Sequence, residues 1–313
     1  MKKTHVILLG LTVCLAVFLF GCSSGREPSG GGEGSSLTDS EGKTVMLPKD
    51  PRVVCLYGSY SEAWMLAGGE PVGVTEDAGS DHKLDLPQDT AIVGTVKEPN
   101  AEVILSLEPD LVILSSDIAA QQDVKQVLEN AGLVCVSFRV DTFDEYAFMM
   151  EQFCRVTGRQ DRYEEYVTRV GERIEAVKAR AAERGEDGPD ILLIRAYSSG
   201  IKAKTDDELA GVILAELGCH NIADDHPSML EDLSMEEVIR SDPDYIFVTT
   251  MGSEEKALTY LDSLIAANPA WQELEAVKNG RNLVLPKALF HYKPNHRWGE
   301  SYEYLAGILF GEE

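Results

Sequence analysis

Short apolar runs alternate with amphipathic stretches from residue 52 onward. The runs RVVCLY (52–57), PVGVT (71–75), LVIL (111–114) and LVCVSF (133–138) are rich in β-branched residues. Between them lie segments with helical patterning, one beginning near Asn100 and one over 121–130, and a third is expected after the capping-box pattern SYSE at 59–62. Strands that alternate with helices of this length predict βαβ units and a mainly parallel sheet.

The pattern changes after residue 141 and later resumes. A second capping box at 142–145 opens a helix, and apolar residues keep one helical stripe from Tyr163 to Ala181, which predicts a connecting helix roughly 35 Å long over about 160–184. Strands are then expected at 191–197, 245–250 and 282–286, with helices at 208–217, 235–240, 254–267 and 298–309. The sequence therefore predicts an α/β fold of two Rossmann-like lobes, 41–141 and 187–313, joined by a helical segment over 142–186.

One stretch occurs twice, once in each predicted lobe. The sequence NAEVILSLEPDLVIL (100–114) resembles SMEEVIRSDPDYIFV (234–248). Asn100 and Ser234 are good N-cap residues, so each copy predicts a short capped helix followed by Pro-Asp and a strand. Glu102 and Glu236 then occupy the second position of their helices, where the helix dipole holds a carboxylate as a fixed charge.

The N-terminus resembles an export signal. A short basic start precedes an apolar run over 6–20, which is too short for a transmembrane helix and typical of a secretory signal. The run ends in LFGC (19–22), which resembles the bacterial lipobox, so a signal peptide over 1–21 and lipidation of Cys22 are expected. The Gly/Ser-rich stretch that follows predicts a flexible tether over 22–40.

Composition narrows the classes of function. With 28 Lys and Arg against 53 Asp and Glu, the formal net charge is −25, which disfavours nucleic-acid binding. The cysteines of the mature chain show no CxxC spacing, which favours small buried side chains over a disulfide framework or a zinc site, although one disulfide stays open.

The ordered set of lipobox, two α/β lobes, one long helix and a Glu at each repeated helix start resembles the iron-siderophore, haem and cobalamin branch of the substrate-binding proteins that serve ABC importers. The resemblance implies a lipid-anchored monomer outside the cytoplasmic membrane, on a Gram-positive surface or in a periplasm. It implies no catalysis and no intrinsic cofactor, with an iron chelate, haem or corrinoid as ligand. It also implies that Glu102 and Glu236 dock on the permease, which works with its ATPase.

The ligand of such a protein is expected between the lobes, where strand ends and helix starts face each other. Aromatic groups there can stack on a macrocycle, cations can pair with an anionic chelate, and Tyr57, His226, Met251 or His291 can ligate haem iron. The ligand-binding candidates are Tyr57, Ser59, Tyr60, Thr95, Tyr197, Met251, His291, Tyr292 and Arg297, with Lys293 and Trp298 as further contributors.

Two alternative functions stay open. A zinc- or manganese-binding lipoprotein of an ABC importer needs several converging His or carboxylate ligands, and histidines 82, 220, 226, 291 and 296 show no paired spacing. A lipid-anchored serine hydrolase needs a nucleophile elbow, and Ser61 follows a strand. Ser61 lacks the glycines of G-x-S-x-G, because Ser59 precedes it and Ala63 follows it at those two positions.

Overall fold

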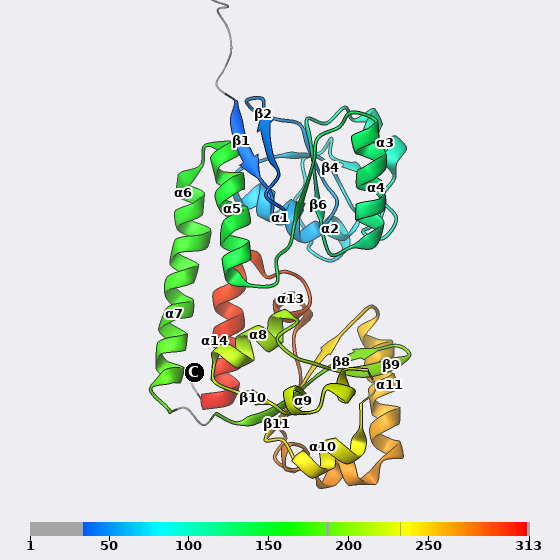
Figure 1. Ribbon diagram of the computed structural model, residues 1–313, viewed down its shortest axis with the longest axis vertical. Coiled ribbons are helices and arrows are strands. Elements are labelled where there is room, and N and C mark those ends of the chain that lie inside the picture. The colour runs from blue at the N-terminus through cyan, green and yellow to red at the C-terminus, as the bar shows by residue number, and fades with distance from the viewer. Residues whose placement is uncertain (1–33, 186–187, 232, 312–313) are drawn as a thin grey trace, which may run out of the picture. The chain divides into compact units, whose positions relative to one another are not determined.

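The computed structural model describes residues 34–185, 188–231 and 233–311 (Figure 1). The predicted signal peptide, the lipidation site Cys22 and the first part of the predicted tether lie outside the described residues. The described residues contain no helix with the length and hydropathy needed to span a bilayer.

The N-lobe is built on a parallel sheet in the order β5-β4-β3-β6-β7. Successive residues of its central strands point to opposite faces of the sheet and pack in two separate hydrophobic cores, as the two-residue period of a strand requires. Val53 and Leu111 join the core on one face, whereas Val54 and Val112 join the core on the other. The strands are β3 (Val53–Cys55), β4 (Pro71–Val74), β5 (Ala91–Ile92), β6 (Leu111–Ser115) and β7 (Cys135–Phe138), and the helices are α1 (Gly58–Leu66), α2 (Asp77–Ser80), α3 (Ala101–Ser106) and α4 (Ala119–Asn130).

A hairpin precedes this sheet where the sequence predicts part of the tether. Strand β1 (Ser35–Thr38) pairs antiparallel with β2 (Thr44–Leu47), and Leu37 and Leu47 are buried in the core. The backbone N–H of Thr38 donates to Oε1 of Gln152 on α5 at 3.1 Å. The tether expected over 22–40 therefore does not extend to residue 40, because its last residues pack as a strand.

The capping box expected at 59–62 is not formed. Helix α1 begins two residues earlier, with Tyr57 rather than Ser59 at the N-cap position and no side-chain cap. The Gly58 N–H donates to Oδ2 of Asp77 at 2.7 Å, and the Ser59 hydroxyl lies 3.1 Å from Nε2 of His82. The helix start is therefore satisfied by α2 and the loop after it rather than by its own side chains.

The predicted helical segment between the lobes is present, but its long helix contains a π-helical turn. Helix α5 (Phe143–Thr157) carries the expected capping box at Thr142. It is followed by α6 (Gln160–Tyr163), the π-helical turn Glu164–Thr168 and α7 (Arg169–Ala182). The stripe of Val170, Ile174 and Val177 is buried, and α7 packs against the C-terminal helix α14 (Figure 1).

Among the described residues, the C-lobe is also built on a parallel sheet, with four parallel strands where the N-lobe has five, and with one antiparallel strand added. Strands β10, β8, β11 and β12 run parallel in that order, and β9 pairs antiparallel with β8 as a hairpin that the sequence analysis does not predict. The strands are β8 (Asp190–Tyr197), β9 (Gly200–Lys204), β10 (His220–Asn221), β11 (Tyr245–Thr250) and β12 (Asn282–Val284), and the helices are α8 (Leu209–Glu216), α9 (Ile222–Asp225), α10 (Met235–Ser241), α11 (Glu254–Ala267), α12 (Glu275–Lys278), α13 (Lys287–Phe290) and α14 (Trp298–Phe310). Short 3₁₀ turns occur at Pro227–Leu230, Pro269–Glu273 and Asn295–Arg297.

The repeated Pro-Asp makes the same contact in both lobes. Asp110 accepts the Arg52 N–H at 2.8 Å through its carboxylate, and its own N–H donates to the Arg52 carbonyl at 2.9 Å. Asp244 does the same with Asp190, at 3.1 and 2.8 Å. Each aspartate therefore fixes the register of the two central strands at their amino ends.

The four cysteines among the described residues are free thiols. Cys55, Cys135 and Cys154 are buried, and Cys219 is partly buried. The sheets and lobes thus confirm the predicted fold class.

Replacement of Asp110 by alanine should remove the clamp and leave the Arg52 N–H without its acceptor. We expect the free energy of unfolding to fall by about 1 kcal/mol, the usual contribution of one such bond, seen as a lower urea midpoint with an unchanged slope. Asp89→Ala is the control, because the Asp89 carboxylate is exposed in a loop and has no partner among the described residues. Equal midpoints for the two variants would contradict the assigned role.

Candidate ligand site at the junction of the lobes

The residues after strand β3 mostly face the protein interior. Tyr60 has no exposed surface, and its hydroxyl donates to the Phe138 carbonyl at 3.0 Å. Ser59 is also fully buried. Neither side chain offers a surface to a ligand in this structure, so both act by holding their neighbours in place.

Tyr57 remains partly accessible. Its ring meets the ring of Tyr60 edge to face, with centroids 5.2 Å apart. Burial raises the pKa of the Tyr57 phenol to about 12, so it is protonated at neutral pH. A phenol in that state can donate a hydrogen bond, whereas an iron ligand would need the phenolate. Thr95 is used locally, because its Oγ1 accepts the Glu98 N–H at 2.9 Å within a turn.

On the C-lobe, the candidates stand at the carboxyl ends of β8 and β11. Tyr197 lines a cavity of about 570 Å³ together with Lys202 and Tyr260. The Met251 N–H donates to the Ala196 carbonyl at 2.9 Å, which prolongs the pairing of β11 with β8. Parallel pairing therefore brings both predicted positions to one edge of the C-lobe sheet.

His291 and Tyr292 follow α13 and stand next to each other. Their ring centroids are 5.1 Å apart, and the Tyr292 ring lies 5.1 Å from that of His82 in the N-lobe. Burial and the nearby charges of Lys287, Arg195 and Lys293 lower the pKa of His291 to about 4. The imidazole is therefore neutral at neutral pH, and its Nδ1 has no hydrogen-bond partner among the described residues.

Three cations influence the pKa of His291, of which the sequence predicts Lys293 as a contributor to the site but not Arg195 or Lys287. Arg195 forms an ion pair with the buried carboxylate of Glu208, Lys287 donates to the Gly252 carbonyl at 2.5 Å, and Lys293 lies 2.6 Å from Asp141. Arg195 could have been found from the sequence, since it interrupts the apolar run ILLIRAY near the carboxyl end of the strand.

A second polar group joins the lobes. Nδ2 of Asn295 donates to the Ser59 carbonyl and to Oε2 of Glu62, each at 2.8 Å. Nδ1 of His82 lies 3.4 Å from Oε2 of Glu62, and Nδ1 of His296 lies 3.7 Å from Oε1 of the same carboxylate. Glu62, His82 and Asn295 are not predicted from the sequence as members of the ligand site, because they are far apart along the chain.

The remaining candidates lie apart from this group. Arg297 pairs with Glu300 three residues along at 2.8 Å. Trp298 has no exposed surface, so the proposed stacking of Trp298 on a macrocycle has no surface to use in this structure. His226 lies 3.6 Å from Glu237 in the C-lobe.

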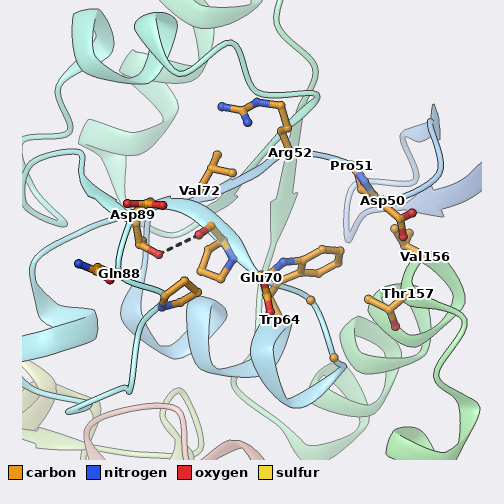
Figure 2. Close-up of a pocket in the computed structure, with 15 residues that line it drawn as sticks. Asp50, Pro51, Arg52, Trp64, Glu70, Val72, Gln88, Asp89, Val156 and Thr157 are labelled. Atoms are coloured by element: carbon orange, nitrogen blue, oxygen red, sulfur yellow. Dashed lines mark hydrogen bonds between the residues drawn. The ribbon is translucent and has the colours of Figure 1, made fainter.

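A separate cavity of about 540 Å³ lies in the N-lobe, beside the amino ends of β3 and β4. Figure 2 shows Trp64, Val72 and Asp89 around it, with the hydrogen bond from the Thr90 hydroxyl to the Pro71 carbonyl. Its lining contains none of the described residues predicted to bind the ligand.

The two alternative functions find little support in the geometry. The Ser61 hydroxyl is buried and donates to the Tyr57 carbonyl at 3.1 Å. Ser59, His82 and Glu62 follow one another in the order of a hydrolase triad, with Ser59 Oγ 3.1 Å from Nε2 of His82 and Nδ1 of His82 3.4 Å from Glu62. Ser59 is fully buried, however, and the N–H of Gly58 next to it already donates to Asp77, so neither is available to a substrate. Among the described residues, no group of three or more His, Cys, Asp or Glu could hold a metal ion.

The two repeated glutamates are exposed on separate lobes. Glu102 lies in the first turn of α3, where Asn100 accepts the Val103 N–H as predicted. Glu236 lies in the first turn of α10, capped by Ser234; its side chain is 81% exposed and lies 2.9 Å from Arg240.

Known proteins are similar in sequence to this chain over nearly its whole length. The Fe(3+)-citrate-binding protein YfmC of Bacillus subtilis is 30% identical over 290 residues, which cover 90% of this chain and 88% of that protein. The putative ABC transporter substrate-binding lipoprotein YhfQ of the same organism is 24% identical over 310 residues, covering 93% and 92%.

Solved structures share the fold. The structure of S. aureus IsdE complexed with heme superposes with a TM-score of 0.68 at 18% identity, over 83% of this chain and 99% of that one. The structure of the petrobactin-binding protein YclQ gives 0.66 at 20% identity, over 89% and 98%. The family model described as "Periplasmic binding protein" matches residues 53–289. Together with the 30% identical relative, this match confirms the predicted resemblance: the chain belongs to the periplasmic binding protein family.

Proposed function

We propose that this protein is the lipid-anchored, extracytoplasmic substrate-binding component of an ABC importer, and that its ligand is an anionic ferric chelate of the citrate class. The observation that carries the ligand assignment is the set of Arg195, Lys287 and Lys293 around a neutral His291. Arginine and lysine bind carboxylates through charge-assisted hydrogen bonds.

The charge of the whole chain makes this cationic group distinctive. The formal net charge is −25, so the field of the whole chain repels anions, and an anion is expected to bind where positive side chains gather. Arg195 and Lys293 are each paired with a carboxylate, whereas Lys287 donates only to a backbone carbonyl among the described residues. Two relatives support the same class of ligand, since YfmC is named for Fe(3+)-citrate and the periplasmic protein FecB of Escherichia coli for Fe(3+) dicitrate. The protein binds the chelate and carries out no chemistry on it.

The anchoring and the partners follow from the N-terminus and from the repeat. Cys22 is the proposed lipidation site, and YhfQ and YfiY of Bacillus subtilis are named as lipoproteins. Glu102 and Glu236 are the proposed contacts with the permease, because each is a fixed, exposed charge on a different lobe. A partner that binds both carboxylates can sense the spacing of the lobes.

Haem is a second candidate, favoured by one observation. The neutral imidazole of His291 has an Nδ1 that is buried and has no hydrogen-bond partner among the described residues, so it could ligate haem iron once a side-chain movement exposes it. Tyr57 suits this role less well, because its raised pKa keeps the phenol protonated. A titration with hemin separates the two candidates, since axial ligation produces a shifted Soret band that ferric citrate cannot give.

Replacement of Lys287 by glutamine should weaken ferric citrate binding about tenfold, because one charge-assisted contact to the anion is lost. Isothermal titration calorimetry of the wild type and the variant at low and high salt measures this loss. Lys278→Gln is the control, since Lys278 is exposed on α12 and pairs with Glu273 at 3.2 Å. Equal affinities for all three proteins would contradict the proposed contact.

Reversing both repeated charges, with Glu102→Lys and Glu236→Lys, should abolish uptake of labelled ferric citrate by cells and leave the affinity of the purified protein unchanged. The reason is that both side chains are exposed on the lobes and lie outside the cationic group. Glu172→Lys with Glu255→Lys reverses two other exposed charges as the control. Normal uptake by the first pair would show that docking uses another surface.

A further inference from the structure

The residues 291–297, here called the crossing segment, connect α13 of the C-lobe to α14. The segment carries His291, Tyr292 and Lys293, and its 3₁₀ turn contacts α1 of the N-lobe and the π-helical turn. Figure 1 shows the chain passing from α13 to the end of α14 that lies beside α5. The position of this segment therefore decides where the C-lobe's ligand groups stand relative to the N-lobe.

Asn295 is held in an unfavourable state at the centre of this segment. The residue has no exposed surface, and its φ of +51° lies in the left-handed region. Its Oδ1 is buried and has no partner among the described residues. Both features raise the free energy of the folded state, since non-glycine residues rarely adopt this conformation and an unpaired buried acceptor loses its hydration.

Two hydrogen bonds from one nitrogen offset this strain. Nδ2 of Asn295 reaches the Ser59 carbonyl and Glu62, both on α1, each at 2.8 Å. Nearby, Lys293 pairs with Asp141 at 2.6 Å. The Lys293 and Asp141 side chains are 17% and 22% exposed, whereas Asn295 has no exposed surface, so the Asn295 contact is the more buried of the two.

Glu62 is kept ionised by its surroundings. Burial opposes its charge, but hydrogen bonds from His82 and Asn295, together with the charges of His82 and His296, outweigh burial and lower the pKa of Glu62. Further groups packed around these residues are Asp77, Asp81, Tyr146, Tyr166 and Tyr292.

We infer that Asn295 is a positioning residue for the ligand site: its double hydrogen bond to α1 fixes the crossing segment and so sets the distance from His291 and Tyr292 to Tyr57. This inference rests on the proposed function. Local strain that is stabilised by specific contacts concentrates at functional sites. Asn295 belongs to the crossing segment, which follows the C-lobe helix α13, but the hydrogen bonds that offset its strain are made to α1 of the N-lobe.

Asn295→Asp tests the hydrogen bond, because it places a second carboxylate beside Glu62. We expect ferric citrate affinity at neutral pH to fall about tenfold or more, the effect of losing a buried bond to a charged group. At about pH 5 the affinity of the variant should approach that of the wild type. The reason is that two neighbouring carboxylates then share a proton, so that one donates a hydrogen bond to the other. The double variant Asn295→Asp with Glu62→Gln should restore affinity at neutral pH, because the glutamine amide can donate to the new carboxylate.

Asn279→Asp is a matched control. Nδ2 of Asn279 also donates to a glutamate, Glu275, at 3.0 Å, but on the exposed surface of the C-lobe. The affinity of the Asn279→Asp variant for ferric citrate should equal that of the wild type, both at neutral pH and at about pH 5. A loss as large as that of Asn295→Asp would overturn the inference, and so would a double variant that stays as weak as the single one.

Hydrogen exchange separates positioning from folding. In the ligand-free protein, Asn295→Gly tolerates the positive φ and removes the side chain, so amides of residues 291–297 and 58–62 should exchange faster while β3, β6, β8 and β11 stay protected. Faster exchange with unchanged ferric citrate affinity would overturn the inference. A wild-type protein that binds no ferric citrate would instead contradict the proposed function.

Discussion

The parallel pairing of two central strands in each lobe, β3 with β6 and β8 with β11, is the constraint on which the site depends. Asp110 and Asp244 fix these pairs at the amino ends through reciprocal hydrogen bonds. Because the strands are parallel and in register, their carboxyl ends reach a common edge, and the polar residues that follow them gather there. The repeated Pro-Asp is thus a structural duplication, and the preceding glutamates are the part of the repeat that the fold does not require.

Periodicity and capping predict most of the fold, and the exceptions have physical reasons. The expected helices and strands appear where apolar residues recur at a fixed period, as in β8, β11, α7 and α14. Strand β1 was missed because SSLT continues a Ser- and Gly-rich stretch, and only its pairing with TVML and its packing on α5 make it a strand. Ser59 matches a capping box by spacing, but its hydroxyl pairs with His82, 23 residues away.

The site was predictable in outline and less so in its chemistry. Tyr197 and Met251 lie at the carboxyl ends of β8 and β11, where the sequence predicts them, and His291 follows α13. Contact of these residues with a ligand stays a prediction. The interactions that give the candidate site its character join residues far apart in sequence: Glu62 and Asn295 are separated by 233 positions. The lowered pKa of His291 likewise arises from burial and three cations on different elements. Such long-range contacts leave no periodic signal, so only the folded structure reveals them.

The central claim is that the cationic group around His291 holds an anionic ferric chelate. The most direct measurement is the absorption spectrum and native mass of the full-length protein purified from cells grown with iron and citrate. We predict a mass increase equal to iron with citrate, a broad near-ultraviolet charge-transfer absorption, and loss of both when the iron is reduced and chelated. A Soret band, a corrinoid spectrum or a catecholate absorption in the visible region would contradict the assigned class of ligand.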